Sequence, residues 1–142
     1  MENINELYRQ VIMDHYKNPR YKGLINNSKY LNIFMSNPSC GDELTIQLYL
    51  EDGIVKDLRH DGKGCSICCA SASIICEKLH EVKIDQSLVI IQNFYEMVKG
   101  LKFNEELINT DELSLQGVAK FPARIKCATL AWKAVEKGLS HD

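Results

Sequence analysis

Residues 44–50 constrain the fold more than any other part of the chain, because Leu, Ile, Leu and Leu occupy every second position. This alternation is typical of a β-strand with one buried face. The Asp52-Gly53 pair that follows is favoured in tight hairpin turns, and residues 54–59 are expected to form the returning strand. A third strand is predicted over residues 30–36. The sequence therefore predicts a small antiparallel sheet.

Helical patterns precede and follow this sheet. Helices are predicted over four segments, namely residues 4–15, 70–81, 86–99 and 123–137. Asp85 is expected to cap the third helix, Gly100 to follow its end, and Gly138 to end the last one. Residues 101–120 show no clear pattern. Because the strands come first and most helices afterwards, without β-α-β alternation, we predict an α+β fold over residues 1–142 as one domain. It would consist of a three-stranded antiparallel sheet with helices packed on one face.

Charge and hydrophobicity exclude several classes of partner. The 142 residues include 17 Lys and Arg and 19 Asp and Glu, for a net charge of −2. Proteins that bind nucleic acids or anionic membranes usually carry a surplus of basic residues. The first residues lack the basic and apolar regions of a signal peptide, and no apolar run approaches about 18 residues. We therefore expect a cytoplasmic protein with no nucleic-acid or membrane partner.

The six cysteines are the unusual feature of the composition. In a reducing cytosol, thiols serve metal binding or chemistry more often than disulfides. Four of the cysteines fall within residues 65–76, whereas Cys40 and Cys127 stand far apart. A small secreted scaffold would spread its cysteines along its loops. Their positions therefore argue against a disulfide framework.

A metal site is one hypothesis for three of these cysteines. In an extended backbone, the side chains of Cys40 and Asp42 project to the same face, so both can converge on one point. Cys65 follows a Gly-Lys-Gly loop where a helix should begin, and a helix N-terminus lowers the pKa of a thiol. Cys127 lies in the first turns of the last predicted helix. Three thiolates and a carboxylate suit Zn²⁺, but spacing alone equally allows Cys40 and Cys127 to be buried as small apolar residues.

The remaining cysteines share one helical stripe with Cys65. Cys76 is expected to pack in the core. The Cys65-x-x-Cys68 spacing is that of a redox or metal pair, although no strand–helix setting of a thioredoxin-like motif is evident from the sequence. Cys68 and Cys69 lie within a turn of Cys65. They are left open as spare ligands or as a resolving thiol.

Several motifs, in order along almost the whole chain, resemble the SufU family of iron–sulfur cluster biogenesis proteins. They are NPSCGD at 37–42, GKGCSI at 62–67, ASAS at 70–73, FPARIKC at 121–127 and the opening LYRQVIMDHYKNPR at 7–20. Lys126 stands where the related IscU and NifU-type scaffolds carry a histidine, and residues 101–120 resemble an insertion that SufU has and those scaffolds lack. Cys68 and Cys69 depart from the family, in which other residues are usual there.

The resemblance implies a SufE/NifU-like fold and a zinc-dependent sulfurtransferase. Such a protein accepts persulfide sulfur from a SufS-type cysteine desulfurase, a pyridoxal-phosphate enzyme, and passes it toward a downstream iron–sulfur assembly scaffold. It implies Zn²⁺ on Cys40, Asp42, Cys65 and Cys127, with Cys40 as the catalytic acceptor. In the family, a histidine of the desulfurase is thought to take a coordination place on the zinc and free the cysteine.

Two alternatives remain beside this hypothesis. The chain could be a scaffold of the IscU type that assembles an iron–sulfur cluster on the same cysteines, or a regulatory partner of the desulfurase in which zinc is purely structural.

Arg124 and Lys126 flank Cys127 and could offset the site's negative charge, since three thiolates and a carboxylate exceed the charge of Zn²⁺ by two. Lys126 equally suits a solvated helix surface. His15 is expected to be a capping or surface residue rather than a ligand.

Overall fold

The computed structural model describes residues 2–140 and confirms the predicted α+β fold. The strands are β1 (Leu31–Asn37), β2 (Asp42–Glu51) and β3 (Ile54–Lys63). The helices are α1 (Glu2–Lys17), α2 (Ser66–Leu79), α3 (Ile84–Val98), α4 (Thr110–Leu113) and α5 (Pro122–Leu139). Short 3₁₀ turns are η1 (Pro38–Cys40), η2 (Glu105–Leu107) and η3 (Gln116–Lys120). That residues 1–142 form one domain stays a prediction.

The sheet is antiparallel with the strand order β1-β2-β3. Leu44, Ile46 and Leu48 of β2 are buried, as the period-two pattern predicts. The β1–β2 register pairs Asn37 with Asp42 at one end of the sheet. β3 continues past its predicted end to Lys63. The sheet therefore delivers the chain directly to the start of α2.

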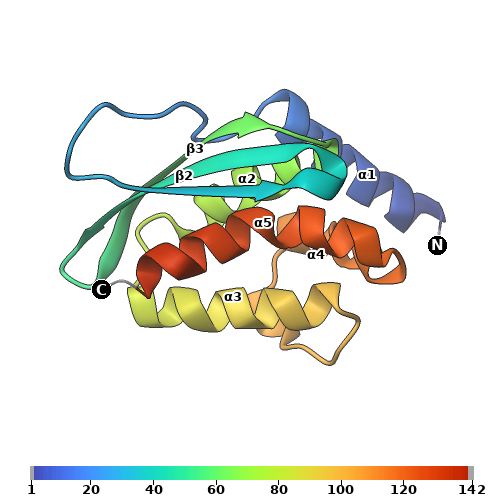
Figure 1. The fold of residues 1–142 in the computed structure, drawn as a ribbon. Coiled ribbons are helices and arrows are strands. Elements are labelled where there is room, and N and C mark those ends of the chain that lie inside the picture. Colours follow the sequence, from blue (N-terminus) through green and yellow to red (C-terminus); the bar gives the residue numbers. More distant parts are fainter. Residues whose placement is uncertain (1, 141–142) are drawn as a thin grey trace.

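The helices cover one face of the sheet, as predicted (Figure 1). α5 packs across β1 and β2, and α2 packs against β3 and α5. α3 lies on the side of α5 that faces away from the sheet, and α1 packs on α2. The first residues of α2 and α5 thereby lie close to the end of the sheet where β2 begins.

A stacked aromatic pair fixes the helical layers against each other. The rings of Phe94 in α3 and Trp132 in α5 are both buried, with centroids 3.7 Å apart and planes 2° from parallel. The Trp132 indole N–H donates to the Ser71 hydroxyl of α2 at 2.8 Å. That hydroxyl in turn donates to the Ala128 carbonyl at 2.6 Å. Buried, partnered groups of this kind hold α2 and α5 in one relative position.

Two residues predicted to mark helix ends do not mark them. α3 begins at Ile84, so Asp85 lies in its first turn instead of capping it. Gly138 lies inside α5, where a Cβ atom would come within 2.4 Å of Leu48 Cδ1. The glycine therefore permits close approach of α5 to the sheet instead of ending the helix. Gly100 does follow the end of α3 in a left-handed conformation, with φ 77°.

Residues 101–120, which show no clear sequence pattern, contain only short helices held by side-chain hydrogen bonds. The side chain of Asn93 brackets the backbone of Asn104, with bonds of 2.9 and 2.7 Å. At the start of α4, the Glu112 carboxylate accepts a 3.0 Å bond from the Asn109 N–H. These contacts are pairings of polar groups, and polar pairings produce no hydrophobic periodicity in the sequence. This is why residues 101–120 show no clear pattern.

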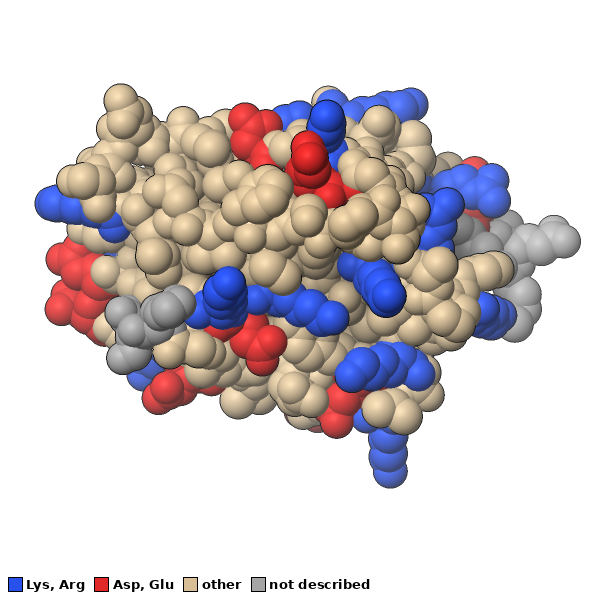
Figure 2. Space-filling model, viewed as in Figure 1, with Lys and Arg blue, Asp and Glu red and all other residues tan. Residues whose placement is uncertain are grey.

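The surface carries charges of both signs. Figure 2 shows Lys and Arg interspersed with Asp and Glu on the face it presents, between broad areas of other residues. This distribution agrees with the small net charge of −2. Among the described helices, none has the length and apolar character needed to cross a membrane.

Candidate metal centre

A turn between β1 and β2 brings a thiol and a carboxylate together. Cys40 ends the 3₁₀ turn η1, and Gly41 follows with φ 69°, a left-handed conformation that glycine adopts without strain. Asp42 then opens β2 and is fully buried, while Cys40 is partly exposed. The sequence argument assumed an extended backbone at Cys40. The convergence it predicted is present, but the turn produces it.

Cys127 completes a cluster of three candidate donors. It lies in the second turn of α5, and its Sγ is 3.2 Å from Cys40 Sγ. One donor atom from each of Cys40, Asp42 and Cys127 lies within 4.8 Å of the other two. The Asn37 side-chain amide donates to Asp42 Oδ2 at 3.5 Å and to Cys127 Sγ at 3.8 Å. This amide therefore holds both groups from the end of β1.

Cys65 lies beside this cluster, at the N-cap of α2. Its backbone N–H donates to Asp42 Oδ1 at 2.9 Å. Its Sγ accepts a 3.5 Å hydrogen bond from the Cys68 N–H, and it also interacts with the Cys127 thiol. The structure thus brings all four predicted site residues to one end of the sheet, with three in the tight cluster and Cys65 adjoining it.

The electrostatics of the cluster suit a bound cation. Burial, followed by hydrogen bonds with the Cys40 and Cys65 thiols, raises the pKa of Cys127. Among the described residues, no Lys or Arg nitrogen lies within 4.0 Å of the buried Asp42 carboxylate. A buried carboxylate usually has a compensating charge, and a metal ion would supply it while favouring the thiolate forms. Three thiols and one carboxylate fit the ligand preference of Zn²⁺.

Arg124 is the cation that interacts with the cluster. It precedes Cys127 by one turn of α5, and its pKa is raised first by a hydrogen bond with Cys127 and then by the charges of Cys65 and Cys127. Lys126 is exposed. Of the two basic residues that flank Cys127, the structure therefore favours Arg124 as the one that offsets negative charge there.

The other three cysteines differ in their surroundings. Cys76 is fully buried in the core, as predicted. Cys68 is 1% exposed, and burial raises the pKa of its thiol. Cys69 is partly exposed and donates to the Gly64 carbonyl with a 3.6 Å separation. None of the three is in the tight donor cluster.

His15 is buried, so its prediction as a capping or surface residue is wrong. It is 1% exposed, its Nδ1 lies 2.8 Å from Ser73 Oγ, and its Nε2 lies 2.7 Å from Asp111 Oδ2. The Ser73 hydroxyl also accepts a 2.8 Å bond from the Arg20 N–H. His15 therefore joins α1, α2 and α4 through partners that are distant in the sequence.

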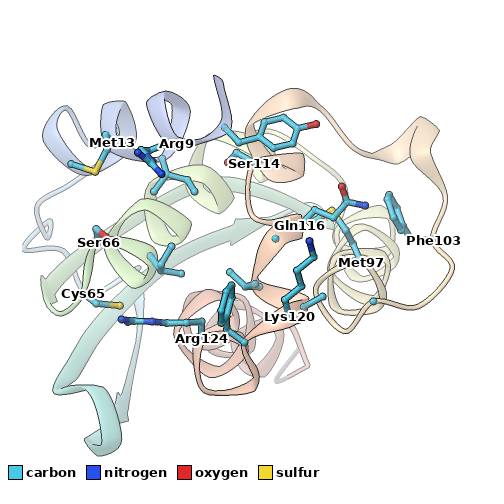
Figure 3. Close-up of a pocket in the computed structure, with 18 of the residues that line it drawn as sticks. Arg9, Met13, Cys65, Ser66, Met97, Phe103, Ser114, Gln116, Lys120 and Arg124 are labelled. Atoms are coloured by element: carbon cyan, nitrogen blue, oxygen red, sulfur yellow. The ribbon is translucent and has the colours of Figure 1, made fainter. Parts of the chain in front are cut away.

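A pocket of about 860 Å³ adjoins the cluster, and sequence reasoning did not find it (Figure 3). Its walls come from α1, the start of α2, residues 97–103, residues 114–120 and the start of α5. Cys65 lies on its rim, and the Arg124 side chain extends toward Cys65. Because the lining residues come from five separate segments, no local pattern marks this pocket.

Comparisons with known proteins match this arrangement to one family. Residues 7–141 match the family model described as the NifU-like N terminal domain. The chain is 46% identical over 140 residues to the zinc-dependent sulfurtransferase SufU of Bacillus subtilis, covering 99% of this chain and 94% of that protein. It is 32% identical over 142 residues to the iron–sulfur cluster assembly scaffold protein IscU of Streptococcus pyogenes, covering 100% of this chain and 88% of that protein.

A solved structure supports the same relationship. The crystal structure of a SufU from Fervidobacterium islandicum, named as an iron–sulfur cluster assembly scaffold protein for the SUF system, superposes with a TM-score of 0.86. It is 29% identical in sequence and covers 92% of this chain and 94% of that one. The three-stranded sheet and its helices therefore have the same architecture as that solved structure.

Proposed function

The chain belongs to the family of NifU-like N-terminal domains, and from this premise we propose that it is a zinc-dependent sulfurtransferase of the SufU type. It would accept persulfide sulfur from a SufS-type cysteine desulfurase for iron–sulfur cluster assembly. The observation that carries the proposal is the cluster of Cys40, Asp42 and Cys127, in which only Cys40 is partly exposed. The Bacillus subtilis relative, which is 46% identical to this chain, is named a zinc-dependent sulfurtransferase.

Cys40, Asp42, Cys65 and Cys127 are the residues that would hold the zinc. When bound, Zn²⁺ keeps thiolates deprotonated at neutral pH. Asp42 and Cys127 are buried and held by Asn37, so they anchor the site. Cys40 lies on an exposed turn and is the thiol that a partner protein can reach.

The transfer step is an exchange at sulfur. The Cys40 thiolate attacks the terminal sulfur of the desulfurase persulfide, the S–S bond of that persulfide breaks, and the desulfurase cysteine leaves as a thiolate. Cys40 then carries the persulfide. Arg124, which interacts with the cluster from one turn of α5 away, would offset the negative charge that gathers there during the exchange.

The proposal is tested by adding the protein to a SufS-type desulfurase and measuring alanine formation from cysteine. The parent protein and Cys69→Ala, a matched thiol outside the donor cluster, are expected to raise turnover, while Cys40→Ala leaves the basal rate. Mass spectrometry of the quenched reaction should find an added sulfur on Cys40. Stimulation by Cys40→Ala equal to that of the parent would contradict the proposal and leave zinc with a structural role.

A second candidate function is that of a cluster scaffold, and the similarity to IscU of Streptococcus pyogenes favours it. It would use the same donors to hold an iron–sulfur cluster. Lys126 is exposed and, as a cation, is a poor metal ligand. It stands at the position where the resemblance places a histidine in such scaffolds, so that possible ligand is missing here. Anaerobic reconstitution with iron and sulfide supports this candidate only if a stable cluster forms and passes intact to an apo-acceptor.

A further inference from the structure

The connection from β3 to α2 places two thiols on one helical turn. β3 ends at Lys63, Cys65 is the N-cap, and Cys68 is the third residue of α2. The Cys68 N–H donates to Cys65 Sγ at 3.5 Å. The sequence showed no strand–helix setting for this Cys-x-x-Cys pair, and the structure corrects that prediction. The setting is a strand, one glycine and a helix that begins at the first cysteine.

The two thiols differ in their access to solutes. Cys65 lies on the rim of the large pocket, whereas Cys68 is 1% exposed. Cys69 turns back to the Gly64 carbonyl, and Cys76 is fully buried two turns further along. A reagent in the large pocket therefore meets Cys65 first, since Cys68 does not line that pocket and contacts Cys65 Sγ through its backbone N–H.

We propose that Cys65 and Cys68 form a reversible disulfide, made by exchange with a small carboxylate-bearing disulfide that binds in the adjoining pocket. The proposed sulfur transfer does not require such a disulfide. The site would sense the ratio of small thiols to disulfides, since the reverse exchange with small thiols restores both cysteines.

The chemistry balances in two exchanges. The Cys65 thiolate attacks the small disulfide, which releases one small thiolate and leaves the other half bound to Cys65. Cys68 then attacks the Cys65 sulfur, and its proton passes to the second small thiol as that thiol leaves. Two cysteine thiols are oxidised, and one disulfide is reduced to two small thiols. The N–H of Cys68 and the N-terminus of α2 stabilise the negative charge on the Cys65 sulfur during the first step.

The pocket determines the class of reagent. Among the residues that the structure describes, the charged ones that line it are Arg9, Arg124 and Lys120, and none is Asp or Glu. Arg9 also lies 4.0 Å from Glu6, and Arg124 interacts with Cys127, but neither of these two partners lines the pocket. The volume of about 860 Å³ lies within the range of small-molecule sites. Figure 3 shows the Arg124 side chain extending toward Cys65 at the edge of the pocket, where it would pair with a carboxylate.

Oxidation of this pair would act on the proposed metal centre. Cys65 is one of the four proposed ligands, and its backbone N–H holds Asp42. A Cys65–Cys68 disulfide withdraws one thiolate from the donor set, so zinc affinity would fall on oxidation. This last consequence rests on the proposed zinc site, whereas formation of the disulfide does not.

The test uses the full-length protein, metal-free and zinc-loaded, with glutathione disulfide as the probe. Trypsin cleaves after Lys63 and Lys78 and leaves Cys65 and Cys68 on one peptide, while Cys40 and Cys127 lie on others. We expect that peptide to lose two hydrogens in the parent and in Cys69→Ala. In Cys68→Ala, Cys65 should instead accumulate the glutathione adduct, because the resolving thiol is missing.

Three results would overturn the proposal: the same adduct accumulating in the parent and in Cys68→Ala, loss of the disulfide in Cys69→Ala, or oxidation that joins only Cys40 and Cys127.

The role of the pocket's charge is tested by measuring the reaction rate at increasing salt concentration. Salt should slow the reaction with glutathione disulfide and should not slow the reaction with cationic cystamine. Equal salt effects on both would overturn the assigned reagent class. Zinc release, read with a chromophoric chelator, should accompany oxidation. A disulfide formed with zinc retained would support the pair and contradict Cys65 as a ligand, so the two failures are distinguishable.

Discussion

The Oδ1 atom of Asp42 accepts a 2.9 Å hydrogen bond from the backbone N–H of Cys65, 23 residues further along the chain. This bond ties the first residue of β2 to the N-cap of α2. Asp42 is fully buried, so its position is fixed from several sides. The candidate metal centre is therefore part of the junction between sheet and helix, and its geometry follows from the fold.

Removing Asp42 should separate its structural role from its role toward a metal. Asp42→Ala leaves the partly buried Cys65 N–H without its acceptor, and we expect the free energy of unfolding of the metal-free protein to fall by about 1–3 kcal/mol. Asp42→Asn keeps an acceptor and removes a buried charge, so its metal-free form should be at least as stable as the parent. Both variants should bind zinc more weakly. Urea unfolding and chelator competition measure the two effects, and parent-like zinc affinity in either variant would count against Asp42 as a ligand.

Gly64 should be intolerant of a side chain. A Cβ atom at this position would lie 2.4 Å from Asp42 Oδ1, so Gly64→Ala must displace that carboxylate. Because the displaced group orients the donor set, we expect zinc affinity to fall about 10–100-fold. Gly117→Ala is the matched control, since no atom lies within 4 Å of a Cβ atom there. Chelator competition on both variants makes the comparison, and equal affinities would show that Asp42 has room to move.

His15 should stabilise the fold without affecting the metal. In His15→Ala, Ser73 and Asp111 lose their bonds to the imidazole and a buried volume is emptied, so the free energy of unfolding should fall by about 2–4 kcal/mol. Lys17→Ala, an exposed change on the same helix, should alter it by no more than about 0.5 kcal/mol. Zinc content measured on the folded variants should be equal. Loss of zinc in a folded His15→Ala protein would link this residue to the metal centre.

The metal-free protein should lose stability in alkaline solution. Burial raises the pKa of Cys76, and burial with the neighbouring thiols raises the pKa of Cys127. In the unfolded chain, a cysteine thiol has a pKa of about 8.5. Above that pH the folded state retains protons that the unfolded state has lost, so unfolding becomes easier by at most about 1.4 kcal/mol per pH unit for each thiol.

Below the unfolded pKa these two thiols leave stability unchanged. Urea unfolding of reduced, metal-free protein between about pH 7.5 and about pH 9.5 measures the slope. Cys76→Ala removes one of the titrating thiols and should make the slope shallower. A free energy of unfolding that stays level or rises over this range would show that neither thiol resists ionisation in the folded protein.

The sequence predicts the sheet well because burial of one face forces a period of two on residues 44–50, whatever the rest of the chain does. Helix ends are less certain, since neighbouring residues compete for the cap, as Lys83 and Asp85 do. His15 was misjudged for a different reason. Its partners Ser73 and Asp111 lie 58 and 96 residues away, and no local pattern records them.

The candidate site was predictable only in part. The four candidate donors were identified from their motifs, and the structure brings them to one end of the sheet; their role as ligands stays a proposal. The turn at Gly41, the Asn37 amide and the pocket depend on how α1, α2 and α5 pack. Sequence patterns give the face that each helix buries, but they do not give the relative positions of helices.

The 3.2 Å contact between Cys40 and Cys127 joins residues 87 positions apart, and α5 is the last helix that the structure describes. During synthesis, the turn that carries Cys40 leaves the ribosome long before α5 can dock on the sheet. A nascent chain therefore cannot present the full donor set until α5 has been synthesised and has folded. This order of synthesis disfavours binding of a metal ion at the site before α5 is in place.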